Sequence, residues 1–292
     1  MRLRLHGADV PYPLSVVRGR LRLCGLSHTE ASSVLDNVVR NLESASLDDL
    51  LNQVRKTLEM NHTSVVNDFE TLSRYEELRA DQAAPSLVVI MSGASATGKS
   101  IIALELVNDL VATRFISSDT VRQVLRNTVD EVTHPELYSH TYQAHVHRQA
   151  GPEDLLPVVR GFLAQCELVT PHIKSMTERI LSEGTLGVVE GVHVIPGEYQ
   201  GFSQGVVEVL INPEEDVHRA MFVSKHDSGL RTVSEDIETR DQEFVATRAI
   251  QDYLSDVATK ERIPTIMMTS FKDAYGEVRK VILNRVKKIV TD

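Results

Sequence analysis

The segment GASATGKS, residues 93–100, constrains this chain more than any other stretch. It fits the pattern G-x-x-x-x-G-K-[ST], directly follows the apolar run SLVVIM and directly precedes an amphipathic helical pattern, which is the context that the motif requires. Backbone N–H groups can wrap around a phosphate only where side chains do not obstruct the turn, so glycine belongs at both corners. The sequence therefore predicts a phosphate-binding loop (P-loop) between a buried strand and a helix.

The residues of this loop indicate its ligands. A helix that begins near Lys99 would present the positive end of its dipole to a triphosphate. Lys99 would contact the β- and γ-phosphates as a catalytic residue, and the Ser100 hydroxyl would hold Mg²⁺. We therefore expect ATP and Mg²⁺ as cofactors. The expected nucleotide-binding residues are Gly93, Ala94, Ser95, Ala96, Thr97, Gly98, Lys99, Ser100 and Ile101.

Strand-like and helical segments alternate after Ser86. The strand-like segments are SLVVIM, RFISS, TLGVVEGVHV, GVVEVLI and TIMM, and a last helix repeats apolar residues from Val278 to Ile289. Strands that are separated by helices pair in parallel, with the crossover helices covering both faces of the sheet. We predict an α/β fold of the P-loop kinase type over residues 86–292, with a mostly parallel sheet flanked by helices.

The first eighty residues indicate a second, mainly helical unit. Ser27 and Glu30 form a capping-box pattern before one helix, a second helix starts at Ser46, and apolar residues from 65 to 75 follow a third. The opening MRLRLHGADVPYP predicts a short hairpin or an extended segment. RADQAAPS, residues 79–86, is polar and ends the helical pattern, so we place a domain boundary there, between domains 1–80 and 86–292.

Composition narrows the partners and the location. The chain has 31 Lys and Arg against 41 Asp and Glu, a net charge of −10, which argues against nucleic acid as a partner. No apolar run approaches the roughly 20 residues of a membrane span, and the amino terminus lacks the apolar core of a signal peptide. Cys24 and Cys166 show no metal-binding spacing and are expected as free thiols. We expect a cytoplasmic protein without a membrane partner.

Four charged residues lie at the end of a predicted strand or on the helical face that follows one. Asp119 comes just after RFISS, at the carboxyl edge where open α/β sheets bind ligands; it could orient an attacking hydroxyl as a catalytic residue, or merely cap a helix. Arg122 and Arg126 share a helical face beside it and could bind an acidic or phosphorylated substrate. Glu190 ends the strand where P-loop proteins usually carry a Walker B acid, so we expect it to hold Mg²⁺ through water.

The remaining candidate residues lie on two polar segments and one strand end. HPELYSHTYQAHVHRQ, residues 134–149, lacks a zinc pattern and is expected to form a helical cap over the acceptor site, where Tyr142 would bind substrate. His193 could line the same site or be a structural histidine. A lid spanning residues 212–244 carries Arg219 and Arg231, which we expect to reach the charge that develops during transfer.

At this point the residues resemble a known family. The P-loop, VVEGVHVIPG, HRAMF and TRAIQDYLSDVATKERIPTI together resemble the archaeal-type 2-phosphoglycerate kinases. The segment from LHGADVPYPLSVVRGRLRLCGLS to RYEELRA is similar to the ATP-cone, a small regulatory nucleotide-binding module. The resemblance implies a P-loop kinase fold, a small phosphorylated substrate, and transfer of the ATP γ-phosphoryl to the 3-hydroxyl of 2-phosphoglycerate, giving 2,3-bisphosphoglycerate. Met221 and Lys225 depart from it, because they stand where arginine is expected.

Several alternatives remain open. The acceptor could be another phosphorylated acid or a polyol, since lysine cannot make the bidentate phosphate contact of arginine. The chain could be a nucleotide-sensing regulator without an acceptor, although a sensor needs no Asp119, Glu190 and basic lid around one site. A nucleic-acid-end kinase is disfavoured by the acidity. Residues 1–80 could act as a regulatory module, join chains into a homo-oligomer, or pack as a lobe on the kinase domain.

Overall fold

A parallel sheet of five strands forms the centre of the described chain. The computed structural model describes residues 1–5, 8–42, 46–227 and 236–291, and the side chains of residues 5, 225–227 and 237 are not described either. The strand order is β4 (Arg114–Ser117), β5 (Gly187–Gly191), β3 (Val88–Ser92), β6 (Val206–Asn212) and β7 (Thr265–Met267). Every neighbouring pair is parallel. The predicted fold class is therefore confirmed.

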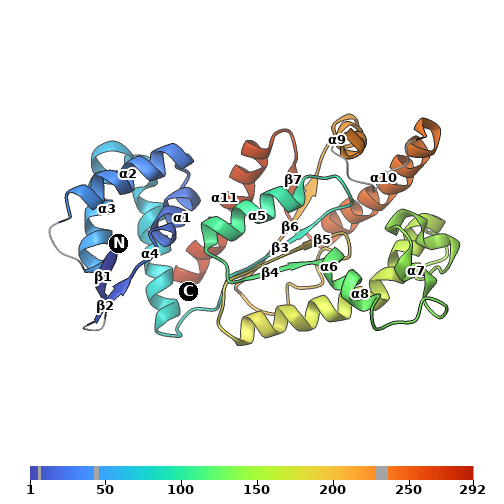
Figure 1. The fold of residues 1–292 in the computed structure, drawn as a ribbon, viewed down its shortest axis with the longest axis horizontal. Helices are drawn as coiled ribbons and strands as arrows, with labels where there is room; N and C mark the ends of the chain where they lie inside the picture. The colour runs from blue at the N-terminus through green and yellow to red at the C-terminus, as the bar shows by residue number, and fades with distance from the viewer. Residues whose placement is uncertain (6–7, 43–45, 228–235, 292) are drawn as a thin grey trace.

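The sheet is buried on both faces because alternate residues of its central strand point to opposite helix layers. Val89 and Met91 join the cluster formed with α5 (Lys99–Leu110) and α11 (Phe271–Thr291), whereas Val88 and Ile90 join the one formed with α6 (Ser118–Leu125) and α8 (Pro157–Ser182). Figure 1 shows α5 and α11 on one side of the sheet and α8 on the other. This explains why SLVVIM is apolar without alternation.

The carboxyl ends of the strands are covered by segments that surround the P-loop. The helices α9 (Glu215–Asp227) and α10 (Ile237–Lys260) lie over one part of this edge, and the short α7 (Pro135–Tyr138) and the 3₁₀ helix η2 (Thr141–Val146) pack on α8 (Figure 1). The predicted helical cap over residues 134–149 thus consists of two short helices. No helix in the described ranges combines the length and the apolar character that a membrane crossing requires.

In the described part of the amino-terminal region, two antiparallel strands and four α-helices are present. They are β1 (Arg2–Leu5), β2 (Ala8–Pro11), α1 (Ser15–Cys24), α2 (His28–Arg40), α3 (Leu47–Asn61) and, after a 3₁₀ turn at Thr63–Val65, α4 (Val66–Ala80). The capping box is present, since the Ser27 hydroxyl accepts from the Glu30 amide at 3.2 Å and the Glu30 carboxylate from the Ser27 amide at 2.7 Å. The sequence analysis missed α1, because its buried Arg20 and Arg22 interrupt the apolar repeat.

This amino-terminal unit shares a hydrophobic core with the rest of the chain. One cluster of buried residues runs from Leu21 of α1 through Leu106 of α5 to Ile282 of α11. Helix α1 approaches α5 so closely that a Cβ on Gly19 would stand 2.1 Å from the Asp109 carbonyl oxygen. The interface therefore depends on a glycine. The domain boundary between residues 80 and 86 stays a prediction.

Two helical glycines provide a matched test of this interface. We expect Gly19→Ala to lower the free energy of unfolding by roughly 1–3 kcal/mol, because the added Cβ forces α1 away from α5. Gly276→Ala on α11 should instead raise it by about 0.5–1 kcal/mol, because nothing lies within 4 Å of the added Cβ and alanine favours a helix. Urea unfolding of both variants measures the difference; equal effects would contradict the close packing of α1.

Candidate active site around the phosphate loop

The P-loop follows β3 and adopts a backbone path that only glycine allows at its two corners. Gly93 has φ +148° and Gly98 has φ +86°, both in the region that side chains disfavour. A Cβ on Gly93 would also stand 2.9 Å from the Thr97 Oγ1 and 3.0 Å from the Ile211 carbonyl oxygen. Helix α5 begins at Lys99, as the motif predicts.

The P-loop and the end of β5 bring together Lys99, Ser100 and Glu190, the three residues that we expected at the phosphates and the metal. Lys99 is buried, and its Nζ donates to the Ala94 carbonyl at 3.2 Å and lies 3.9 Å from Glu190 Oε2. The Ser100 Oγ donates to the same Glu190 Oε2 at 3.2 Å. Glu190 reaches them because β5 pairs with β3 in parallel, with Met91 opposite Glu190. A cation, a hydroxyl and a carboxylate thus share one end of the sheet.

Two polar residues that the sequence analysis did not single out hold the loop in place. Gln251 of α10 is fully buried; its Oε1 accepts from the Ala94 amide at 2.8 Å, and its Nε2 donates to the Ile211 carbonyl at 3.1 Å. His218 of α9 donates from Nε2 to the Ser95 carbonyl at 2.8 Å. Gln251 occurs in TRAIQDYLSDVATKERIPTI, which was quoted only for the family resemblance, and His218 occurs in HRAMF, within the predicted lid segment. A polar residue among apolar helix positions was the signal available.

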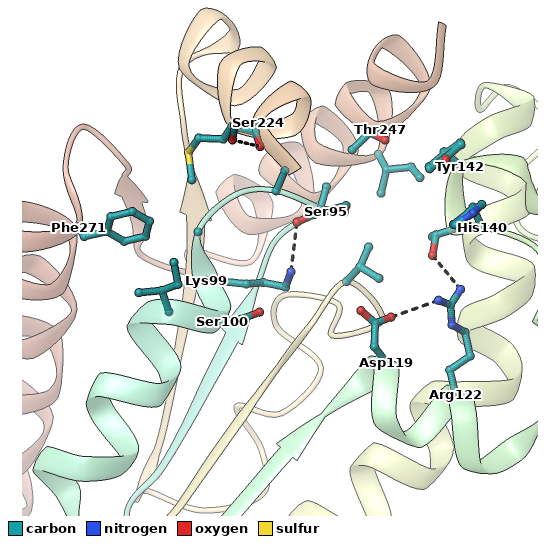
Figure 2. Close-up of a pocket in the computed structure, with 18 residues that line it drawn as sticks. Ser95, Lys99, Ser100, Asp119, Arg122, His140, Tyr142, Ser224, Thr247 and Phe271 are labelled. Carbon is teal, nitrogen blue, oxygen red and sulfur yellow. Dashed lines mark hydrogen bonds and ion pairs between the residues drawn. The ribbon is translucent and has the colours of Figure 1, made fainter. Parts of the chain in front are cut away.

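A cavity of about 610 Å³ opens beside the loop. Figure 2 shows Lys99 and Ser100 between two arms, with Phe271 on one side and Asp119, Arg122, His140 and Tyr142 on the other. We call the side with Phe271 and Met221 the apolar arm, and the side with Asp119, Arg122, His140 and Tyr142 the polar arm. The described residues that line the cavity are Ala94, Ser95, Ala96, Gly98, Lys99, Ser100, Ile101, Asp119, Arg122, His140, Thr141, Tyr142, Val192, Met221, Ser224, Thr247, Ile250 and Phe271.

The two predicted substrate arginines separate in the structure. Arg122 lines the cavity; its Nη2 lies 3.4 Å from Asp119 Oδ1 and its Nη1 donates to the Ser139 carbonyl at 3.2 Å. Burial lowers the pKa of Arg122 below its ordinary value, and Asp119 opposes that shift. Arg126 is not among the lining residues, because its Nε donates to the Leu137 carbonyl at 2.9 Å and thereby holds the cap.

The other two predicted substrate residues also differ in position. Tyr142 lines the polar arm, and its ring stacks on His140 with centroids 5.2 Å apart. His193 is fully buried and is not among the lining residues; its Nδ1 lies 3.2 Å from the Ser118 Oγ and its Nε2 3.0 Å from the Gln165 Oε1. The sequence left two roles open for His193. Its buried, doubly hydrogen-bonded position favours the structural role.

The predicted lid is only partly described. Arg219 of α9 pairs with Asp241 and lies 3.6 Å from Glu215, its guanidinium carbon 4.3 Å from the Phe244 ring centre, and it is not among the lining residues. Arg231 and the side chain of Lys225 lie outside the described residues. Met221, where arginine was expected, lines the cavity with its Cε 3.2 Å from the position of a Cβ on Gly98.

The burial of His193 predicts a pH dependence of stability. Burial, followed by the charge of Arg122, lowers the pKa of His193 to about 3, whereas an unfolded chain has the ordinary value of about 6.5. Between these values only the unfolded chain binds the proton, so stability should fall with decreasing pH by at most about 1.4 kcal/mol per unit. His193→Gln should reduce this slope in urea unfolding between pH 7 and pH 4. An unchanged slope would contradict a neutral buried imidazole.

Several curated 2-phosphoglycerate kinases are similar to this chain in sequence. The 2-phosphoglycerate kinase of Methanopyrus kandleri is 26% identical over 99% of this chain and 88% of its own length. Those of Methanothermobacter thermautotrophicus and Thermococcus kodakarensis are 28% and 26% identical, over 82% and 96% of this chain and 78% and 94% of their own lengths. No family model matches. The resemblance is confirmed: over nearly its whole length this chain is similar in sequence to archaeal 2-phosphoglycerate kinases.

Proposed function

We propose that this protein is an ATP-dependent kinase that phosphorylates 2-phosphoglycerate to 2,3-bisphosphoglycerate. One observation carries the proposal: Lys99 and Ser100, both of which lie against Glu190, line the same cavity as the Asp119–Arg122 pair, on the carboxyl edge of the sheet. A phosphoryl donor and an anionic acceptor would therefore meet in the same place. The activity named for the related proteins supports the choice of acceptor.

On the donor side, the P-loop would hold the phosphates of ATP. Lys99 would exchange its contact with the Ala94 carbonyl for the β- and γ-phosphates, and the amino-terminal end of α5 would favour the same negative charge. Ser100 and Glu190 offer the oxygen ligands that Mg²⁺ prefers, and the ion would neutralise charge on the phosphate oxygens. The purine base would lie in the apolar arm, against Met221 and Phe271.

On the acceptor side, Arg122 would bind the carboxylate or phosphate of the substrate. Asp119 would orient the 3-hydroxyl and accept its proton while the hydroxyl oxygen forms a bond to the γ-phosphorus and the bond to the bridging oxygen of ADP breaks. Tyr142 would cover the acceptor from the cap. Arg219 and Arg231 as cations that reach the transferred phosphoryl group stay predictions, and closing would have to release Arg219 from Asp241.

We also propose that residues 1–80 act as a unit that supports the kinase core. Arg22 of α1 pairs with Glu105 and lies 3.3 Å from Asp109, both on α5, the helix that begins at the P-loop lysine. In addition, Lys287 of α11 binds Asp68 of α4 at 2.7 Å. The same contacts would serve a regulatory role. A nucleotide bound to residues 1–80 could change the position of α5 through Arg22, Glu105 and Asp109.

The experiment that tests the function is ADP release from Mg-ATP in the presence of different acceptors. A panel of 2-phosphoglycerate, other phosphorylated acids, polyols and RNA ends covers the alternatives. We expect strong stimulation by 2-phosphoglycerate. Stimulation by another member only would overturn the acceptor, and ATP binding without any stimulated release would leave a nucleotide-sensing regulator.

The role of the P-loop lysine has its own test. Lys99→Ala should lower kcat by at least about 100-fold, because a charge aimed at the developing phosphoryl negative charge is lost. The fold should persist, since the variant loses one hydrogen bond to the Ala94 carbonyl and a 3.9 Å ion pair with Glu190, while Glu190 keeps its hydrogen bond from Ser100. Circular dichroism and the ADP-release assay check both statements. A folded variant with near-normal turnover would remove the P-loop assignment.

The two arginines of the acceptor region form a matched pair. Arg122→Ala should raise KM for the acceptor by about 30-fold or more, corresponding to about 2 kcal/mol, and spare KM for ATP. Arg126→Ala should chiefly lower the melting temperature, because Arg126 binds the cap at the Leu137 carbonyl and not the cavity. Steady-state kinetics with both substrates tests this. Equal changes in the two KM values for Arg122→Ala would show that the acceptor does not bind at Arg122.

A further inference from the structure

A buried chain of three polar side chains lies behind the polar arm, and we call it the His193 network. It consists of Ser118, His193 and Gln165, each essentially inaccessible to solvent. The Gln165 Nε2 donates to the carbonyls of Glu136 and Ser139, so its Oε1 must accept from the His193 Nε2. His193 is then the neutral tautomer whose Nδ1 accepts from the Ser118 hydroxyl. Every side-chain group of the network therefore has a partner.

The two ends of this network meet the two residues of the acceptor side. Ser118 is the first residue of α6 and directly precedes Asp119. At the other end, Gln165 and Arg122 donate to the same carbonyl, that of Ser139, at 3.2 Å each. Figure 2 shows Asp119 and Arg122 side by side on α6, with Arg122 directed toward the cap that carries His140. One buried network thus touches both sides of the acceptor region.

The backbone around the network leaves it little freedom. Gly191, at the end of β5, has φ +150°, and a Cβ there would stand 1.9 Å from the Ser118 Oγ. Thr170 of α8 donates to the His193 carbonyl at 2.9 Å. The P-loop is held separately, by Gln251 and His218. Loss of the His193 network would therefore disturb the acceptor side and leave the nucleotide side in place.

We propose that the His193 network is a positioning device for the phosphoryl acceptor, with Gln165 and Ser118 as its two contact points. Ser118 fixes the start of α6 and hence Asp119, which orients the attacking hydroxyl. Gln165 fixes the Ser139 carbonyl and hence the guanidinium of Arg122, which binds the anionic group of the acceptor. This inference rests on the proposed function and extends it to residues that do not touch the substrate.

The contacts at the two ends of the His193 network can be removed by separate substitutions. In Ser118→Ala, kcat should fall by about 10- to 100-fold with little change in either KM, because misplacement of a reacting group by about 1 Å has this effect. In Gln165→Met, KM for the acceptor should rise by about 10-fold or more, because a carbonyl that helps to hold Arg122 loses one partner. KM for ATP should stay within about twofold in both variants, because the P-loop contacts are untouched.

A matched control separates positioning from mere stability. Thr177 lies on α8, is fully buried and donates to the Ile173 carbonyl at 2.8 Å, but it is remote from the network. Thr177→Val should lower the melting temperature like the other variants and leave kcat and both KM values unchanged. All assays are run well below the melting temperature of each variant. If Gln165→Met fails to fold, the kcat of Ser118→Ala alone decides.

The outcomes distinguish this inference from the proposed function. Turnover by the wild type, together with a fall in kcat for Ser118→Ala and a rise in acceptor KM for Gln165→Met, supports the network as a positioning device. Turnover by the wild type with both variants kinetically unchanged overturns the network and leaves the function standing. A wild type that releases ADP with no acceptor of the panel overturns the proposed function, and this inference with it.

Discussion

The backbone of residues 93–98 has to stay open toward a phosphate and yet be fixed toward the protein, and much of the structure serves this requirement. Gly93 and Gly98 supply the positive φ angles, and Gln251 engages the Ala94 amide from α10. His218 holds the Ser95 carbonyl from α9. The loop is therefore held in place by α9 and α10, the two helices that follow β6.

The positive charge at the candidate site comes from a few side chains and not from the chain as a whole. The chain carries a net charge of −10, and its polar arm nevertheless holds Arg122 beside Asp119, with Lys99 close to Glu190. Pairing each buried cation with a carboxylate limits the cost of removing it from water. An anionic substrate would then compete with these carboxylates for the cations. The selectivity of such a site depends on geometry rather than on a broad positive field.

One departure from the family pattern, Met221, lies in the apolar arm. Met221 lies with Met268 and Phe271 around Gly98, all three within 3.2 Å of the position of a Cβ there. A flexible, polarizable side chain suits a wall against a planar base. Arginine at this position would instead place a positive charge and hydrogen-bond donors in this wall. Under the proposed function, this departure would therefore affect the nucleotide side as well as the acceptor side.

The sequence by itself determined the P-loop, the order of strands and helices, and the place of Asp119 and Glu190 at strand ends. These features are encoded within a few residues: glycine at a corner, an apolar run, a charge directly after a strand. It also indicated both capped helices of the amino-terminal unit, but not α1, whose buried arginines break the apolar pattern.

Only the tertiary structure decided which of the equivalent candidates face the cavity. Arg122 and Arg126 look alike in sequence, and the cap determines that one lines the cavity while the other binds the Leu137 carbonyl. His193 became a buried link between Ser118 and Gln165, and Gln251 a support for a loop 157 positions away. Such contacts join residues far apart in the chain, so no local pattern of residues can encode them; packing of the helices over the sheet brings them together.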